Sequence, residues 1–162
     1  MVRIETTYLI NELPKDLEKH KSAEIEQGYL IDADDACRIR RKDDEYSFTR
    51  KIIAIMGDKS VREHIEIPIV KEEFTQLWKA VTKSLTKKRY YYDSKMGTDL
   101  RVDVFEGKLK GLVLAELVFS DENYLRDFEP PKWFGREVTS ESWASNQFLS
   151  GKSYADVKKL IK

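Results

Sequence analysis

The chain has 162 residues and carries 29 Lys and Arg against 29 Asp and Glu, so its formal net charge is zero. This length fits a single domain over residues 1–162, because domains usually contain roughly 100–200 residues. A neutral chain has no overall field that attracts nucleic acid or an anionic membrane, and we expect neither as a partner. Binding of an anion would therefore require a local cluster of basic residues.

The single cysteine, Cys37, excludes an intramolecular disulfide, and the N-terminus lacks the long apolar core of a signal peptide. The longest apolar runs are far shorter than the roughly 18 residues of a membrane-spanning helix. These features predict a cytoplasmic protein.

Strand signals dominate the chain, because β-branched and aromatic residues recur in short runs that alternate with polar residues. The short connections between most of these runs predict an antiparallel sheet that is closed or nearly so. The predicted strands, in chain order, are 2–10, 26–31, 36–42, 46–54, 61–67, 86–92, 99–105 and 112–119.

Helices are fewer. Phe74, Leu77, Trp78 and Val81 form one apolar stripe, which predicts a helix over 71–84. Ser153 is followed three residues later by Asp156, and this pair predicts the N-cap of a C-terminal helix. Helical turns are expected near 14–20 and 121–128.

Basic residues recur at alternate positions within several of the predicted strands. Side chains two residues apart in a strand project from the same face, roughly 7 Å apart. Such a face can be the ordinary solvated side of an antiparallel sheet. It can also grip a chain of phosphates, because guanidinium forks bind phosphate oxygens bidentately. The residues concerned are Arg38 and Arg40 in 36–42, Lys51 in 46–54, and Lys87 and Arg89 in 86–92.

Taken together and in order, these segments resemble the CYTH family, also called triphosphate tunnel metalloenzymes. The resemblance implies an α+β fold that is mainly antiparallel β, with an eight-stranded closed barrel forming a tunnel that is polar inside and has helices packed outside. The matching pieces are IETTYLI at 4–10, IEQGYL at 25–30, RIRRKDDEYSFTRK at 38–51, REHIEIPI at 62–69, KKRYYY at 87–92, RVDVFEGKLKGLVLAELVF at 101–119, WFGREVT at 133–139, and Asn146.

The resemblance also assigns roles to the basic residues of the tunnel. Arg136 stands where the family usually has Lys, and Arg3 stands where the family has an acidic residue. Arg40 and Lys51 are expected to act in catalysis together with Glu66. The substrate-binding residues implied by the resemblance are Arg3, Arg38, Arg40, Lys51, Lys87, Arg89 and Arg136.

The acidic positions depart from the family pattern. Each of the three acidic pairs of the family keeps one member here, and Thr7 replaces the opening lysine. A hard cation such as Mg²⁺ is held by oxygen ligands and by substrate phosphates, and it often needs only one or two protein carboxylates. We therefore expect Mg²⁺ or Mn²⁺, and one ion rather than two. The implied metal ligands are Glu5, Glu66 and Glu116.

Three functions are compatible with this pattern. The first is hydrolysis of inorganic tripolyphosphate or a related triphosphate by water attack on a terminal phosphoryl group. The second is a degenerate protein that binds polyphosphate or nucleotide phosphates without turnover, and a lesser third is a class IV-like adenylate cyclase. The partner is then a small-molecule triphosphate or polyphosphate, and a homodimer is one option for assembly. His64 can be a metal ligand, a general base or a solvated side chain, and Asp103 a metal ligand or the partner of one.

Overall fold

The computed structural model describes residues 4–33, 36–55, 58–93 and 97–161, together with the side chains in these ranges except those of residues 51–64. Arg3 and the side chains of Lys51 and His64 therefore lie outside the described residues. Among the helices that are described, none is long and apolar enough to cross a membrane.

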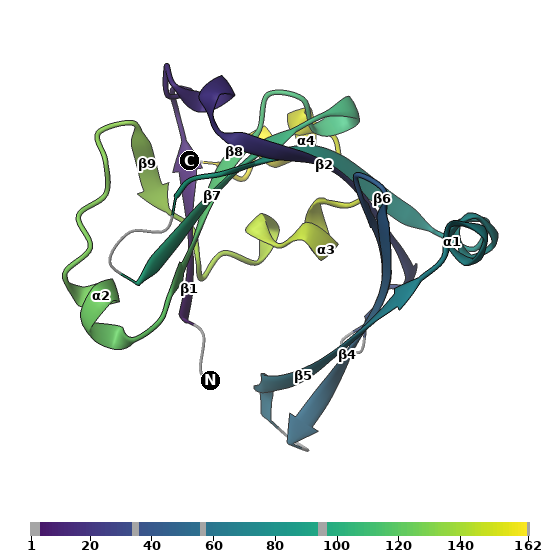
Figure 1. Cartoon of the computed structure of the whole chain (residues 1–162). Helices are drawn as coiled ribbons and strands as arrows, with labels where there is room; N and C mark the ends of the chain where they lie inside the picture. The colour runs from purple at the N-terminus through teal and green to yellow at the C-terminus, as the bar shows by residue number, and fades with distance from the viewer. Residues whose placement is uncertain (1–3, 34–35, 56–57, 94–96, 162) are drawn as a thin grey trace.

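One strongly curved antiparallel sheet dominates the chain (Figure 1). Its strand order is β5-β4-β3-β2-β6-β7-β8-β1-β9. The eight predicted strands are all present, and several are longer than predicted. The strands are β1 (Ile4–Ile10), β2 (Lys21–Ile31), β3 (Cys37–Lys42), β4 (Glu45–Ile55), β5 (Asp58–Ile69), β6 (Lys83–Tyr91), β7 (Thr98–Phe105), β8 (Val113–Phe119) and β9 (Phe134–Glu137).

The sheet differs from the expected closed barrel in two respects. A ninth strand, β9, adds to β1 at one edge, which the sequence pattern did not predict because the strand has only four residues. The two edge strands are β5 and β9, and within the described ranges no backbone ladder joins them. The sheet therefore curls around a hollow without being closed by hydrogen bonds.

The helices are short. α1 ends at Trp78, earlier than the predicted 84, because the chain returns to the sheet as β6 at Lys83. Ser153 caps α4 reciprocally with Asp156, as predicted. The helices are α1 (Lys71–Trp78), α2 (Glu122–Arg126), α3 (Asn146–Leu149) and α4 (Tyr154–Lys158), and the 3-10 turns are η1 (Leu17–Lys19), η2 (Gly107–Leu109) and η3 (Ser142–Ala144).

The convex face of the sheet is apolar where helices and the chain after α2 cover it, which explains the inverted alternation in the sequence. Tyr8, Leu117 and Phe119 point outward and are covered by Phe128 and Trp133 from the chain after α2. α1 packs against β3 and β4 elsewhere on the sheet. The close approach of α1 and the turn after it requires Gly28 of β2, because a Cβ atom there would lie 2.9 Å from Trp78 and 2.6 Å from Val81. The charged positions between these apolar residues therefore face the hollow.

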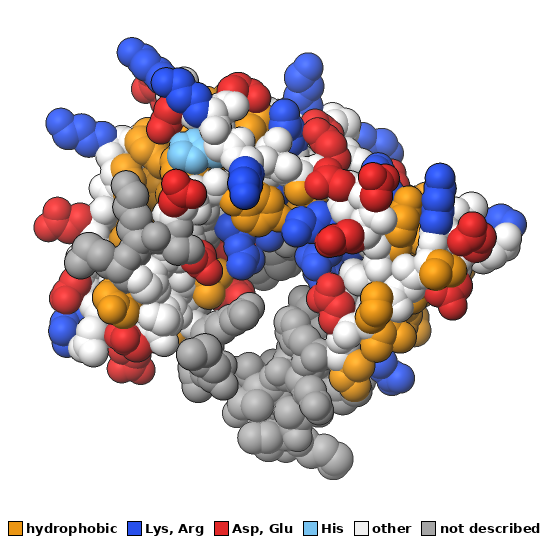
Figure 2. All heavy atoms as spheres, in the orientation of Figure 1, with side chains coloured by type: hydrophobic (Ala, Val, Ile, Leu, Met, Phe, Trp, Pro, Cys, Tyr) orange, Lys and Arg blue, Asp and Glu red, His pale blue; other side chains and the backbone are white. Residues whose placement is uncertain are grey.

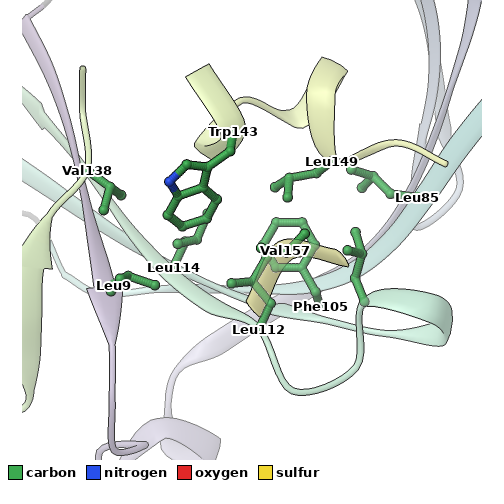
Figure 3. Close-up of a cluster of buried hydrophobic side chains, with 10 residues drawn as sticks. Leu9, Leu85, Phe105, Leu112, Leu114, Val138, Trp143, Leu149 and Val157 are labelled. Atoms are coloured by element: carbon green, nitrogen blue, oxygen red, sulfur yellow. The ribbon is translucent and has the colours of Figure 1, made fainter. Parts of the chain in front are cut away.

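One end of the hollow is filled by an apolar cluster (Figure 3). Leu9, Leu114 and Phe105 come from the concave side of β1, β8 and β7, and Trp143 and Leu149 come from η3 and α3. Figure 1 shows α3 on the concave side of the sheet. The expected helices outside the sheet are therefore present as α1 and α2, and the C-terminal segment in addition fills one end of the interior.

Candidate active site

Strand register brings four of the predicted basic residues, Arg38, Arg40, Lys87 and Arg89, onto the concave face. Arg38 of β3 lies opposite Thr49 of β4, and Thr49 lies opposite Glu66 of β5. On the other side of β2, Arg89 of β6 lies opposite Asp103 of β7. Figure 2 shows Lys and Arg side chains along the wall of the hollow. Residues far apart in sequence thus share one surface.

Asp103 is the centre of a buried ionic cluster. Arg89 donates from Nε to Asp103 Oδ1 at 2.7 Å and from Nη2 to Oδ2 at 2.8 Å. Lys87 Nζ donates to Asp103 Oδ2 at 2.7 Å. The exposed fraction is 1% for Lys87 and 5% for Asp103. The structure therefore places Asp103 as the partner of two basic residues, and its oxygens are engaged by them.

The cluster keeps its charges. Burial alone raises the pKa of Asp103, but the nearby charges and hydrogen bonds of Lys87 and Arg89 outweigh burial and hold the pKa well below its usual value. Burial lowers the pKa of Lys87, and the charge of Asp103 opposes that effect. Asn146 Oδ1 accepts a second hydrogen bond from Lys87 Nζ at 2.9 Å. Because Nζ lies 2.7 Å from an oxygen of the Asp103 carboxylate, we assign the two side chains as an ion pair.

Two of the three predicted metal ligands are paired with arginines. Glu116 accepts from Arg89 Nη2 at 2.8 Å and lies 3.5 Å from Arg101 Nη1. Glu66 accepts from Arg40 Nη2 at 3.1 Å. Glu5 is exposed on β1.

These carboxylates are chemically suited to Mg²⁺ or Mn²⁺, which prefer oxygen ligands. However, Glu66 lies on the edge strand β5, whereas Glu5 and Glu116 lie on the adjacent strands β1 and β8. Among the described residues, no three His, Cys, Asp or Glu side chains gather into a metal cluster. The described part of the chain does not form a protein-only cage for a metal.

Arg38 and Arg40 form the less neutralised part of the site. Arg38 Nη2 donates to Thr49 Oγ1 at 3.2 Å, but its Nε is buried and has no hydrogen-bond partner among the described residues. Burial and the neighbouring charge of Arg40 both lower the pKa of Arg38. A buried donor without an acceptor, next to a second cation, is stabilised by an anion.

The concave face carries two polar residues that the sequence prediction did not include. Arg101 faces the hollow two positions before Asp103, a place that period-two alternation within RVDVF could have identified. Gln27, 1% exposed, lies on the same face opposite Arg40. Arg136, expected among the substrate-binding residues, lies on β9 at one edge of the sheet and pairs with Glu141.

An antiparallel sheet curled around a face of arginines, lysines and carboxylates defines a phosphate-binding tunnel fold, and comparison with known proteins gives the same answer. No family model matches the chain. An inorganic triphosphatase of Nitrosomonas europaea is 34% identical over 153 residues, covering 93% of this chain and 97% of that protein. One of Acetivibrio thermocellus is 32% identical over 133 residues, covering 82% and 83%.

A solved structure of an inorganic triphosphatase superposes with a TM-score of 0.72 at 29% identity, covering 93% of this chain and 95% of that chain. The chain belongs to the triphosphate tunnel metalloenzyme, or CYTH, family.

Proposed function

We propose that this protein is a divalent-metal-dependent hydrolase that cleaves inorganic tripolyphosphate or a related triphosphate bound against the concave face of the sheet. The observation that carries the proposal is Arg38, whose buried Nε has no acceptor among the described residues and whose neighbour is a second arginine. Relatives that cover nearly the whole chain are named inorganic triphosphatases, which favours hydrolysis over cyclisation.

Arg38 and Arg40 would bind the phosphate chain directly, and Lys51 of β4 stays a proposed third basic residue. The fork of Arg89 and one proton of Lys87 are already engaged by Asp103, so these two residues would contribute charge and their remaining N–H groups. Arg3 and Arg136 would extend the basic lining toward β1 and β9. Fixed cations that surround the phosphoryl oxygens stabilise the charge of the transition state, the main source of catalysis in phosphoryl transfer.

Glu5, Glu66 and Glu116 would hold Mg²⁺ or Mn²⁺ together with substrate phosphate oxygens, one ion being sufficient for this ligand set. A bound ion neutralises phosphate charge and orients the terminal phosphoryl group. For this to occur, Glu66 and Glu116 must release their arginine partners and bind the metal ion instead. The phosphate oxygens of the substrate would then accept hydrogen bonds from the released arginines. Binding of substrate and metal would therefore be coupled.

The domain organisation, location, partner and assembly of the protein are part of the same proposal. The chain would act as a single domain over residues 1–162, in the cytoplasm, with a small-molecule triphosphate as its partner and neither nucleic acid nor a membrane. A homodimer is one option for its assembly. His64, whose backbone lies opposite that of Lys51 in the β4–β5 ladder, stays a candidate metal ligand or general base.

A second function is favoured by one observation: the arginine pairs of Glu66 and Glu116 occupy carboxylates that a metal would need. A protein that retains polyphosphate without turnover would keep these pairs. In that case, restoring the family residues by Arg3→Glu, Thr7→Lys, His64→Glu and Val118→Glu should raise hydrolysis greatly. In an enzyme whose present residues suffice, the same changes should have little effect.

The decisive experiment measures phosphate release from tripolyphosphate, pyrophosphate, ATP and thiamine triphosphate with Mg²⁺, Mn²⁺ or EDTA, alongside calorimetric binding of each compound. We expect metal-dependent release from at least one triphosphate, lost in Glu66→Gln and retained in Glu45→Gln, an exposed carboxylate at the first residue of β4. Tight tripolyphosphate binding in EDTA, with no release under any metal, would refute the enzyme and leave the binding protein.

A further inference from the structure

A second cavity, of about 500 Å³, lies on the convex side of the sheet. Leu100 of β7 and Leu117 of β8 contribute its apolar floor. In their strands these residues alternate with Arg101 and Glu116, which face the hollow. The cavity is therefore separated from the candidate active site by the thickness of the sheet, and the proposed phosphate chemistry does not use it.

Aromatic rings form much of its wall. The ring of Tyr92 stacks on that of His20, with centroids 3.7 Å apart and an interplanar angle of 24°. The ring of Tyr92 also stacks on that of Trp133, with centroids 6.0 Å apart and an interplanar angle of 27°. Tyr124 of α2 and Phe128 also line the cavity.

The charged groups of the cavity are predominantly acidic. Asp16, Asp93, Asp127 and Glu129 all line it, and its described lining includes neither Lys nor Arg. Asp16 lies 3.4 Å from His20, and Asp127 is paired with the exposed Arg126 at 3.2 Å. Asp93 and Glu129 are exposed.

The hydroxyl of Tyr92 lies in a buried environment that is influenced by the charge of Asp16. Its hydroxyl is buried and has no hydrogen-bond partner in the described part of the chain. Burial, and secondly the negative charge of Asp16, raise the pKa of Tyr92 to about 12. The Asp16 carboxylate, the second cause of this shift, would attract a cation, whereas burial by itself would not.

We propose that this cavity binds a small organic ammonium cation, of the alkylammonium or quaternary ammonium class. The electron-rich faces of aromatic rings attract cations, and recognition of quaternary ammonium groups is a known use of aromatic walls. The carboxylates supply opposite charge, and the Leu100 and Leu117 floor accommodates alkyl groups. An anion would be repelled by the same carboxylates.

The test is a titration of the full chain with choline and tetramethylammonium, followed by calorimetry and by the indole N–H resonance of Trp133, assigned with Trp133→Phe. The neutral control is 3,3-dimethyl-1-butanol, which has the shape of choline without its charge. We expect saturable choline binding that shifts the Trp133 resonance, and at least tenfold weaker binding of the alcohol.

Asp93→Asn combined with Glu129→Gln should weaken choline binding roughly tenfold, because it removes two of the carboxylates that attract the cation. Glu122→Gln, an exposed change in α2 outside the cavity lining, is the matched control and should leave binding unchanged. Tripolyphosphate binding by the double variant verifies that its fold is intact, and Asp93→Asn alone is the milder variant. Absence of saturable choline binding, equal binding of the alcohol, or an unchanged affinity in both carboxylate variants would overturn the proposal.

Discussion

Asp103 and Arg89 face each other across β7 and β6 as a bidentate pair, with Nε and Nη2 of the arginine 2.7 and 2.8 Å from the two carboxylate oxygens. Both side chains are buried, and the same carboxylate also accepts from Lys87. One negative charge thus organises two of the cations that the sequence suggested for phosphate binding. Its role can be tested separately from substrate contact.

Asp103→Asn should be strongly destabilising. It leaves the buried Lys87 and Arg89 without their counter-charge, and breaking a buried ion pair from one side typically costs about 3–5 kcal/mol of unfolding free energy. Urea denaturation measures this quantity. Asp44→Asn, in the exposed turn between β3 and β4, is the control and should change stability by less than about 0.5 kcal/mol. A loss of the same small size for Asp103→Asn would contradict the cluster described here.

The same carboxylate should make stability depend on acidic pH. Because the pKa of Asp103 is lower in the folded state, its stabilising contribution is present above the unfolded value of about 3.9 and is lost as pH falls toward the folded value. We expect the difference in unfolding free energy between the wild type and Asp103→Asn to narrow steadily below about pH 4. Urea denaturation of both proteins between pH 6 and 2.5 would measure it. A difference that stays constant over this range would show that Asp103 is not ionised more readily in the folded protein.

Phosphate binding should depend on which face of β3 is changed. Arg38→Gln and Arg40→Gln remove guanidinium groups from the concave face, and each should lower tripolyphosphate affinity by about tenfold or more, since hydrogen bonds to charged groups contribute roughly 1.5–3 kcal/mol. Arg41→Gln is the matched control, because Arg41 lies on the convex side and pairs with Glu26. Calorimetry with tripolyphosphate in EDTA separates these contacts from metal binding. Equal losses in all three variants would indicate a general charge effect instead of a site.

Asn146 should matter for activity more than for stability. Its side chain reaches from α3 into the hollow and accepts from Lys87 at 2.9 Å, so Asn146→Ala should leave the ammonium less well positioned and lower kcat several-fold. Gln147→Ala is the matched control, because the next side chain of the same helix donates to Asp32 instead. Steady-state phosphate release from tripolyphosphate compares them. Identical kinetics in the two variants would show that Asn146 has no role in the active site.

Much of the architecture was predictable because it is encoded in short-range alternation. Arg38 and Arg40 lie two apart with Ile39 between them, and the same period runs through Lys87 to Arg89 and Arg101 to Asp103, so the polar face of each strand follows from the sequence. The order of the motifs was sufficient to indicate the family. β9 was missed because four residues carry too little alternation, and α1 was predicted too long because apolar spacing continues through Val81 into the turn before β6.

Pairing of charges could not be predicted in this way, because it depends on which strands become neighbours and in which register. Only the fold brings Asp103 to both Lys87 and Arg89, Glu66 to Arg40, and Asn146 of the C-terminal segment into the hollow. The sequence alone therefore determined that the chain is strand-rich, with one basic face of residues suited to phosphate. The tertiary structure decided which of those cations are paired with carboxylates. It also buries the Nε donor of Arg38, which has no hydrogen-bond acceptor among the described residues.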